Sequence, residues 1–473
     1  MQQLQDQHLW QTRAYINGQW QDSADSFVVT NPANGQQLAC VADMTATEAG
    51  LAVQAASVAF ADWSVKPVAE RSALLMKWYQ LMMQHQQDLA LILTLEQGKP
   101  LSEAMAEIAY GASYIQWFAE QAKRLSGDTL PAPSADKRLL VLRQPVGVVT
   151  AITPWNFPNA MLARKAAAAL AAGCTFVAKP ASETPLSALA LAELSQRAGI
   201  PAGVFNLLTQ HPLVAKFSFT GSTAVGKRLL QQCATGVKRV TMELGGNAPF
   251  IVFADADLDA AVSGLMAAKF RNAGQTCVCA NRVLVQQQVL EPFVDKLRLA
   301  VAKLVVADGV TPGAQIGPLI NAKALAKVSQ LVDDACQQGA SLLVGGAIAS
   351  AGPQFYQPSL LTGVTAEMAI SQQEIFGPVV AVQRFCDEAE AIHLANDTDY
   401  GLAGYFYSRD IGRVFRVAAA LKFGMLGINE GIISDASAPF GGVKQSGFGR
   451  EGSRHGLDDY TELKYLCLGG ISG

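Results

Sequence analysis

The sequence is poor in charged residues and in histidine, and it lacks any long apolar run. Charged residues make up only 16% of its 473 residues and the formal net charge is −3, so the chain offers no basic surface for nucleic acid. The most apolar stretch, residues 166–178, is too short to cross a bilayer. The five histidines lie apart from one another, which argues against a zinc site and against a Cys–His protease. We therefore expect no nucleic acid, membrane or metal partner.

The eight cysteines have no disulfide-framework spacing, and the Gln-rich N-terminus lacks the basic and apolar regions of a secretion signal. Both features predict reduced thiols and a cytoplasmic location. A chain of this length is too long for one hydrophobic core, so two or three domains are expected.

Strands and helices alternate along two stretches of the chain, after an N-terminal segment with hairpin signals at Asn17-Gly18 and Asn34-Gly35. In the first stretch we predict strands at 148–152, 175–178 and 204–208 and helices at 158–172 and 187–198. In the second we predict strands at 249–253 and 283–285 and helices at 257–270 and 291–302. This alternation predicts an α/β fold with parallel sheets. The alternating segments 138–149 and 460–467 predict exposed strands that pair with another element or subunit.

One connection does not fit this pattern. Strands 204–208 and 216–220 should be parallel neighbours, but only about seven residues join them. A parallel crossover needs a dozen residues or more, usually including a helix. Either the two strands are not neighbours, or residues are missing between Thr209 and Pro212.

The segment 270–279 places Cys277 in a short loop after a predicted helix, beyond Gly274. Free backbone amides in such a loop lower a thiol pKa and can hold an oxyanion. Glu243 stands between Met242 and Leu244, apolar neighbours that raise a carboxyl pKa toward that of a general base. The alternatives are a buried structural cysteine and a surface carboxylate beside a turn.

Two further polar residues follow predicted strands. Asn156, in the motif TPWNFP at 153–158, lies where ligands bind in open α/β sheets and can donate to an oxyanion, or it can cap the next helix. Lys179 ends the following strand, where a ribose or phosphate would lie, or it is a solvated lysine. Arg164 and Arg271 would bracket the reactive centre and suit a substrate with an anionic end, unless both are surface residues.

Two glycine patterns point to nucleotides less directly. Residues 221–227 match a phosphate-binding loop up to Lys227, but Arg228 replaces the hydroxyl that holds magnesium, which disfavours ATP. A strand-to-helix turn that holds a cofactor phosphate remains the alternative. Residues 447–452 spell the dinucleotide fingerprint, but no predicted strand precedes them, so we interpret the match as accidental.

Taken together, the motifs resemble the aldehyde dehydrogenase superfamily along essentially the whole chain. The motifs that carry the resemblance are PWNFP at 154–158, KP at 179–180, FTGS at 219–222, ELGG at 243–246, GQTC at 274–277, EIFGP at 374–378 and PFGG at 439–442. Two segments, FRNAGQTCVCANR at 270–282 and NEGIIS at 429–434, are most similar to the succinate-semialdehyde dehydrogenase branch.

The resemblance implies a role for each matching residue. Cys277 would attack the aldehyde carbon, with Asn156 and the Cys277 amide holding the oxyanion and a hydride passing to the nicotinamide. Glu243 would then activate water to hydrolyse the thioester. Arg164, Arg271 and Ser434 would bind the distal carboxylate of the substrate. The implied cofactor-binding residues are Thr153, Trp155, Lys179, Ser182, Gly221, Ser222, Glu374 and Phe376.

The resemblance also implies the cofactor and a possible redox switch. Many NAD-preferring relatives carry a glutamate where Ser182 stands, and a serine beside Lys179 can accept a 2′-phosphate. We therefore expect NADP as the preferred cofactor, with NAD tolerated, unless Glu183 turns inward. Cys279 could form a disulfide with Cys277 and block catalysis, or it is an inert neighbour. Relatives have roughly ten more residues between Leu208 and Pro212, forming a helix beside the adenine.

The resemblance implies a discontinuous cofactor domain (1–122 and 146–245), a catalytic domain (246–445) and an oligomerisation element (123–145 and 455–473). The expected activity is the oxidation of succinate semialdehyde to succinate, with glutarate semialdehyde or another short aldehyde as the rival substrate. A non-catalytic descendant that serves as a binding or structural protein is the alternative of a different class. The family forms homodimers or homotetramers, and the sequence does not choose between them.

Overall fold

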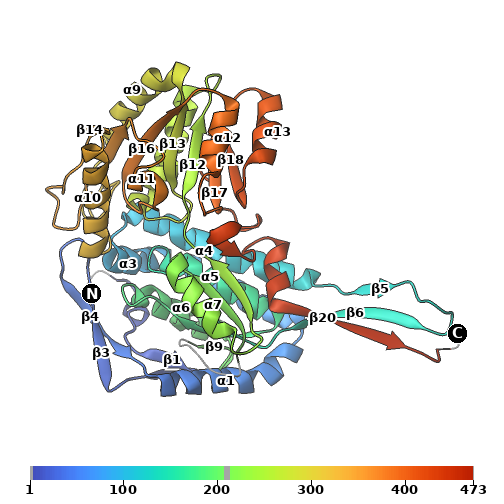
Figure 1. Cartoon of the computed structure of the whole chain (residues 1–473). Helices are drawn as coiled ribbons and strands as arrows, with labels where there is room; N and C mark the ends of the chain where they lie inside the picture. The colour runs from blue at the N-terminus through green and yellow to red at the C-terminus, as the bar shows by residue number, and fades with distance from the viewer. Residues whose placement is uncertain (1–3, 207–213, 472–473) are drawn as a thin grey trace.

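The computed structural model describes residues 4–206 and 214–471, and it holds two α/β halves with a β arm that projects from the body (Figure 1). The first half is built on a six-stranded sheet in the order β19-β11-β10-β7-β8-β9. Its strands are β7 (Val148–Ile152), β8 (Thr175–Lys179), β9 (Phe205–Asn206), β10 (Val214–Thr220), β11 (Arg239–Glu243) and β19 (Gly447–Phe448). All its pairs are parallel except that of the edge strand β19.

Helices and two small hairpins surround the first sheet. The helices are α1 (Ala46–Val65), α2 (Val68–Gln84), α3 (Gln86–Gln97), α4 (Leu101–Gln121), α5 (Pro158–Ala172), α6 (Pro185–Ala198) and α7 (Thr223–Cys233). The hairpins are β1 (Ala14–Ile16) with β2 (Gln19–Gln21) and β3 (Asp25–Thr30) with β4 (Gln37–Asp43). Both hairpins turn where the Asn-Gly pairs predicted them.

The second half is built on a seven-stranded sheet in the order β14-β15-β16-β13-β12-β17-β18, parallel except for the edge strand β14. Its strands are β12 (Ala248–Val252), β13 (Ala280–Gln286), β14 (Ser341–Val344), β15 (Ser359–Thr362), β16 (Val379–Phe385), β17 (Ala403–Tyr407) and β18 (Met425–Ile428). Its helices are α8 (Leu258–Phe270), α9 (Leu290–Val301), α10 (Ala322–Gln337), α11 (Ala369–Gln372), α12 (Glu388–Asn396) and α13 (Ile411–Ala420). The predicted α/β class with two parallel-sheet units is confirmed.

Helix α5 shows how local sequence fixes the element that carries the site. Pro158 occupies its first turn, where a missing N–H costs nothing, and Gly173 ends it in the left-handed conformation with φ 94°. The predicted bounds therefore match the observed ones. Every residue of α5 is buried, because its many alanines let α4 and α6 pack closely around it.

The strand order shows where the two strands joined by the short connection lie in the sheet. The expectation that strands 204–208 and 216–220 are neighbours is wrong, because β7 and β8 lie between β9 and β10. Residues 209–212, on which the alternative of missing residues depends, lie outside the described part of the chain.

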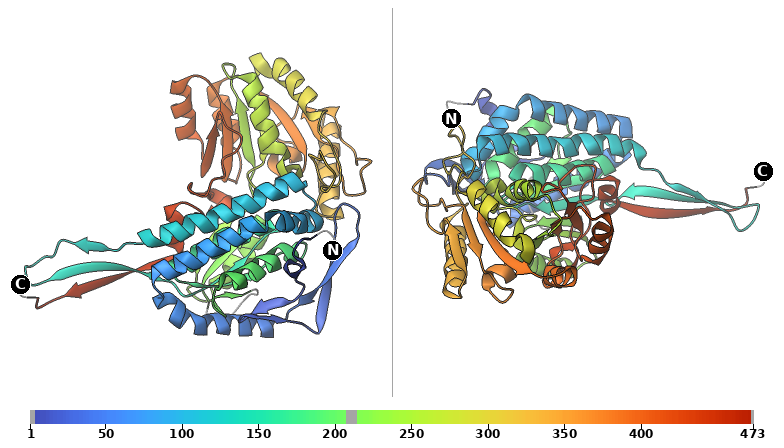
Figure 2. Two further views of the ribbon diagram at one scale, coloured as in Figure 1. Left: turned by 180° about the vertical axis from the view of Figure 1, so that it is seen from behind. Right: turned by 90° about the horizontal axis from the view of Figure 1, so that it is seen from above.

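The arm consists of β5 (Asp128–Leu130), β6 (Arg138–Pro145) and β20 (Thr461–Leu468). Strand β20 pairs antiparallel with β6 over its whole length, from Thr461 opposite Pro145 to Leu468 opposite Arg138. Figure 2 shows the arm extending away from the body in both views. Among residues 4–206 and 214–471, no helix has the length and apolar character needed to cross a membrane.

Candidate active site

One cavity of about 500 Å³, here named the thiol cavity, is lined by Cys277, Asn156 and residues predicted to bind the nicotinamide end of the cofactor. Both halves of the chain contribute to its wall. Its lining includes Trp155, Asn156, Gly221, Ser222, Gly245, Cys277, Ile320, Asn321, Lys323, Lys327, Glu374 and Phe376. The carboxyl ends of β7, β10 and β11 supply the side from the first half, which is the edge where open α/β sheets bind ligands.

Cys277 lies on a loop whose backbone is held in an uncommon conformation. Asn272 and Ala273 both have φ 53°, a region that non-glycine residues seldom occupy. The Asn272 amide donates to the Glu103 carboxylate at 2.7 Å, and its side chain donates to the Asn156 carbonyl at 2.9 Å. Cys277 itself is half-buried and lines the cavity, so the alternative of a fully buried structural cysteine is wrong.

A close approach of two backbones brings the segment that follows Glu243 against the Cys277 loop. A Cβ on Gly246 would lie 2.2 Å from the Cys277 carbonyl oxygen, so only glycine fits there. Glu243 ends β11 three residues earlier and is 4% exposed, which contradicts the surface alternative. Neither of its carboxylate oxygens has a hydrogen-bond partner among the described residues.

Burial shifts the pKa values of both reactive groups upward. It raises the pKa of Glu243 to about 8, with help from the Glu451 charge and against the charge of Arg164. It raises the pKa of the Cys277 thiol to about 12, where the Glu243 carboxylate adds to the rise and Arg164 and Arg271 oppose it. The thiol is therefore protonated at neutral pH and needs a base to become a nucleophile.

Asn156 is fixed by its backbone and by its side chain. Its carbonyl accepts from Lys99 Nζ at 2.8 Å, and Lys99 is paired with Glu107 at 2.5 Å. Its Nδ2 donates to the Gln275 carbonyl at 3.0 Å, which leaves one N–H for a ligand. The helix-cap alternative is wrong, because Phe157 is the N-cap residue of α5.

Arg164 is fully buried on α5, which contradicts the surface alternative. Its guanidinium pairs with Glu451 and lies 4.5 Å from the centre of the Phe440 ring. The neighbouring Lys165 pairs with the same carboxylate. The two terminal nitrogens of Arg164 are buried and have no hydrogen-bond partner among the described residues.

Arg271 and Ser434 lie on loops of the second half. Arg271 is half-buried, and its guanidinium lies 5.4 Å from the centre of the Phe157 ring. Ser434 is half-buried in the segment between β18 and Phe440, the residue whose ring faces Arg164. The charges of both arginines act to lower the pKa of the Cys277 thiol, whereas no described contact joins Ser434 to either arginine.

Trp155, Phe376 and Glu374 form one wall of the thiol cavity. The two rings meet edge to face, with centroids 5.5 Å apart, and Phe376 has a left-handed φ of 57°. The Glu374 carboxylate accepts from the Gly246 amide at 3.0 Å. Burial raises the pKa of Glu374 to about 7, against the Gly246 hydrogen bond and the charge of Lys327.

The turn at Gly221 and Ser222 opens helix α7 directly after β10. The Ser222 hydroxyl is the N-cap and accepts from the Val225 amide at 3.5 Å. The first N–H groups of a helix have no partner within the helix, and they favour an anion. This strand-to-helix turn is the form expected for a cofactor phosphate.

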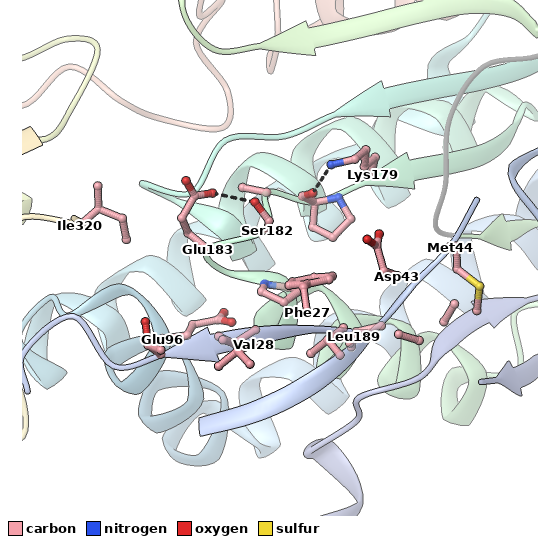
Figure 3. A pocket seen from close by; sticks show the side chains of 18 of the residues that line it. Phe27, Val28, Asp43, Met44, Glu96, Lys179, Ser182, Glu183, Leu189 and Ile320 are labelled. Atoms are coloured by element: carbon pink, nitrogen blue, oxygen red, sulfur yellow. Dashed lines mark hydrogen bonds between the residues drawn. The ribbon is translucent and has the colours of Figure 1, made fainter. Parts of the chain in front are cut away.

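A second cavity, of about 520 Å³ and here named the hairpin cavity, lies between β3, β4 and the start of α6. Figure 3 shows Lys179, Ser182 and Glu183 on one side of it and Phe27 and Asp43 of the hairpin on the other. Lys179 donates to the Pro180 carbonyl at 3.5 Å, and Ser182 donates to the Glu183 carboxylate at 3.4 Å. Glu183 also lines this cavity, which is the condition that the sequence set against NADP.

The two cavities together fit a dinucleotide. Ile320 and Asn321 line both of them, so a long ligand can pass from one to the other. Thr153 and Thr220, at the ends of β7 and β10, each have a buried hydroxyl with no partner among the described residues. The Thr153 amide donates to the Lys179 carbonyl at 3.1 Å, which ties the two strand ends together. Within the described residues, no group of metal-ligating side chains gathers.

Cys279 points away from the cavity. It is buried, and its thiol donates to the carbonyls of Lys269 at 3.5 Å and Ala280 at 3.6 Å. Burial raises its thiol pKa, against the charge of Lys269. A disulfide with Cys277 would require this side chain to leave both carbonyls, and it remains a prediction.

The residues that hold the reactive groups in place were not predicted from the sequence. Glu451 pairs with Arg164 and Lys165, and it lies in the segment that spells the accidental dinucleotide fingerprint. Lys99 and Glu107 support Asn156 from α4 and the turn before it. No local pattern marks any of the three, because each acts through a partner far away in the sequence.

Comparisons with known proteins agree with this arrangement. The model of the aldehyde dehydrogenase family matches residues 20–466. A succinate-semialdehyde dehydrogenase [NADP(+)] of Escherichia coli is 56% identical, over 98% of this chain and 99% of its own. A 3-sulfolactaldehyde dehydrogenase of Pseudomonas putida is 56% identical over the full length of both chains. A glutarate-semialdehyde dehydrogenase of Pseudomonas aeruginosa is 53% identical, over 99% and 100%.

The fold and the chain length can be compared in the same way. The crystal structure of an E. coli NADP dependent enzyme superposes with a TM-score of 0.97 at 55% identity, over 99% of this chain and 100% of that one. The alignment with the Pseudomonas putida protein runs over 484 positions against 473 residues here. At least eleven positions of that relative therefore have no counterpart in this chain.

Proposed function

The chain belongs to the aldehyde dehydrogenase family, and we propose that it oxidises succinate semialdehyde to succinate with NAD(P) through a thioester on Cys277. Glu243 serves as the base, and Asn156 with the Cys277 amide holds the oxyanion. The substrate class is supported by two guanidinium groups, those of Arg164 and Arg271, whose charges both act on the pKa of the Cys277 thiol. The unpartnered terminal nitrogens of Arg164 suit the distal carboxylate of a semialdehyde.

The residues act in sequence at one place. The Cys277 thiol loses its proton to solvent as its sulfur attacks the carbonyl carbon, and the carbonyl oxygen takes up negative charge beside Asn156. The nicotinamide supplies the hydride acceptor when bound. Glu243 then removes a proton from water, which attacks the thioester and releases the acid and the Cys277 thiol.

Two related substrates compete with succinate semialdehyde. Glutarate semialdehyde is one methylene longer, and one methylene in a pocket changes transition-state binding by only about 1–3 kcal/mol. 3-Sulfolactaldehyde ends in a sulfonate, an anion that paired arginines also accept. Relatives that bear all three activities in their names are similarly close to this chain.

The experiment that tests the proposal is a steady-state comparison of the three aldehydes, each with NADP and with NAD. Succinate semialdehyde with NADP is expected to give the highest kcat/KM. A higher kcat/KM for glutarate semialdehyde or 3-sulfolactaldehyde would show that succinate semialdehyde is not the preferred substrate. Equal rates with an uncharged aldehyde of the same length would show that Arg164 and Arg271 do not bind the distal carboxylate of the substrate.

We extend the proposal to cofactor preference, assembly and location. Ser182 and Lys179 favour the 2′-phosphate of NADP, and Glu183 opposes it, so both cofactors are accepted with NADP ahead. The arm exposes Leu142, Leu463 and Tyr465, which suits pairing with a second copy in a homodimer or homotetramer. The eight unpaired cysteines fit a cytoplasmic location.

The domain limits also remain part of the proposal. Strands β5, β6 and β20 fall within or beside the segments 123–145 and 455–473 assigned to oligomerisation. The sheet of the first half uses strands from 146–245, and that of the second half uses strands from 246–445. The pair Gly447–Phe448 returns to the first sheet from outside these limits.

A further inference from the structure

The start of helix α10 stands where the two cavities meet. Ile320 and Asn321 line both the thiol cavity and the hairpin cavity. Asn321 is the N-cap of this 16-residue helix, and its side chain accepts from the Ala324 amide at 2.9 Å. The Ile320 amide donates to Gln275 Oε1 at 3.0 Å, which ties the helix start to the loop that precedes Cys277. Any ligand that fills both cavities must pass this point.

Two lysines of α10 lie on the cavity side of the helix. Lys323 and Lys327 are four residues apart, so they lie on one face, and both line the thiol cavity. Lys327 donates to the Glu374 carbonyl at 2.6 Å, and this hydrogen bond holds its side chain beside Glu374. Lys323 lies one turn closer to Asn321, is exposed, and has no ion-pair partner among the described residues.

The thiol cavity is also lined by Gly221 and Ser222 at the start of α7. A helix start presents free N–H groups and a positive partial charge. Lys323 of the second half and the start of α7 in the first half therefore both present positive charge to the same cavity, close to the passage between the two cavities.

We propose that Lys323 binds the pyrophosphate of the dinucleotide from the second half of the molecule, together with the start of α7 in the first half. The inference rests on the proposed function for the presence of a dinucleotide. A pyrophosphate joins the two nucleosides of both NAD and NADP, and the passage at Ile320 and Asn321 joins the two cavities. Because this group is common to both cofactors, Lys323 contributes to affinity without choosing between them, in contrast to Ser182 and Glu183.

Calorimetric titration of NADP and of NAD into the aldehyde-free enzyme tests this role without turnover. The variants are Lys323→Gln, Lys323→Arg and, as a control, Lys303→Gln, an exposed lysine that lines neither cavity. Lys323→Gln is expected to raise the Kd of both nucleotides by about five- to tenfold and to flatten the dependence of Kd on salt. Lys323→Arg is expected to retain most of the affinity, and the control is expected to bind as the unmodified protein does.

Each other outcome overturns the inference. An unchanged Kd shows that Lys323 does not touch the cofactor, and a loss for NADP alone assigns it to the 2′-phosphate. A raised KM for the semialdehyde with unchanged nucleotide Kd assigns it to the substrate. If the unmodified protein binds neither nucleotide, the proposed function fails first, and the two failures are thereby distinguished.

Discussion

The thiol cavity and the hairpin cavity differ in how firmly their polar groups are held. In the thiol cavity, Asn156 is held through its carbonyl and its amide, and Glu374 is held by the Gly246 amide. In the hairpin cavity, Lys179 and Ser182 are exposed, and their only described side-chain hydrogen bonds are 3.5 and 3.4 Å long. The thiol cavity is therefore built from buried polar groups that are held by hydrogen bonds, and the hairpin cavity from solvated ones.

This difference separates the tasks of the two cavities. Covalent chemistry requires reacting atoms to be placed within a few tenths of an ångström, and buried supports provide that placement. Recognition of a ribose or a 2′-phosphate depends on a small difference in charge, which exposed side chains supply without fixed geometry. Substitutions in the thiol cavity should therefore change kcat by orders of magnitude, and substitutions in the hairpin cavity should change cofactor preference modestly.

Cys277→Ala gives the largest expected effect. Removal of the nucleophile should lower kcat by on the order of 10⁴-fold or more, because no other thiol lines the cavity among the described residues. The free energy of unfolding should change by about 1 kcal/mol or less, since the side chain is half-buried. Turnover of aldehyde and thermal unfolding measure the two quantities. Turnover within tenfold of the unmodified enzyme would remove Cys277 from the chemistry.

Glu243→Gln should act on the second half of the reaction. The variant should still form the thioester and release one equivalent of reduced cofactor per site as a burst. Its steady-state kcat should fall by about 10²- to 10⁴-fold, because water lacks its base. Stopped-flow absorbance of the reduced cofactor measures both phases. Loss of the burst itself would assign Glu243 to thiol activation instead.

The raised pKa of Glu243 gives this prediction a pH dependence. The group must be ionised to accept a proton, so kcat should rise with pH and level off above about 8, and the Gln variant should lack this rise. Stability should show the opposite trend. Because the folded pKa lies above the unfolded value of about 4.3, the stability contribution of this carboxyl is lost as pH rises toward 8. The midpoint temperature of thermal unfolding should therefore fall less steeply between pH 5 and pH 8 in Glu243→Gln than in the unmodified protein.

The same contrast explains what the sequence could predict. Helix α5 and the strand ends carrying Thr153 and Lys179 follow from local signals, namely Pro158, Gly173 and runs of apolar residues. The motif around Cys277 is equally local. The residues that support the site are not marked by local signals, because Lys99 lies 57 residues from Asn156 and Lys165 lies 286 residues from Glu451. Such pairs depend on how the sheets pack, and charge alone does not reveal a buried partner.

Ser182→Glu and Glu183→Gln test the hairpin cavity in opposite directions. A carboxylate at position 182 should weaken NADP binding by about tenfold or more through repulsion of the 2′-phosphate, with little change for NAD. Removing the charge of Glu183 should strengthen NADP binding by about threefold. Because Ser182 is exposed and Glu183 only half-buried, thermal stability should stay nearly constant. Titrations of both nucleotides measure the ratio of their Kd values. Identical changes in Kd for NAD and NADP would place the 2′-phosphate elsewhere.

Cys279→Ala gives the smallest expected effect on the untreated enzyme. This variant tests how rigid the Cys277 loop of the thiol cavity is. Peroxide can oxidise Cys277 and Cys279 to a disulfide, each thiol giving up one hydrogen as the peroxide is reduced to two molecules of water. The thiol of Cys279 must first leave the carbonyls of Lys269 and Ala280.

If the loop permits this rearrangement, peroxide-treated enzyme should recover activity with a dithiol, and Cys279→Ala should recover markedly less. A Cys336→Ala variant, which changes a half-buried cysteine outside both cavities, is the matched control. Equal sensitivity and equal recovery in Cys279→Ala would show that no disulfide forms. The strained backbone at Asn272 and Ala273 would then hold Cys277 too firmly to reach its neighbour.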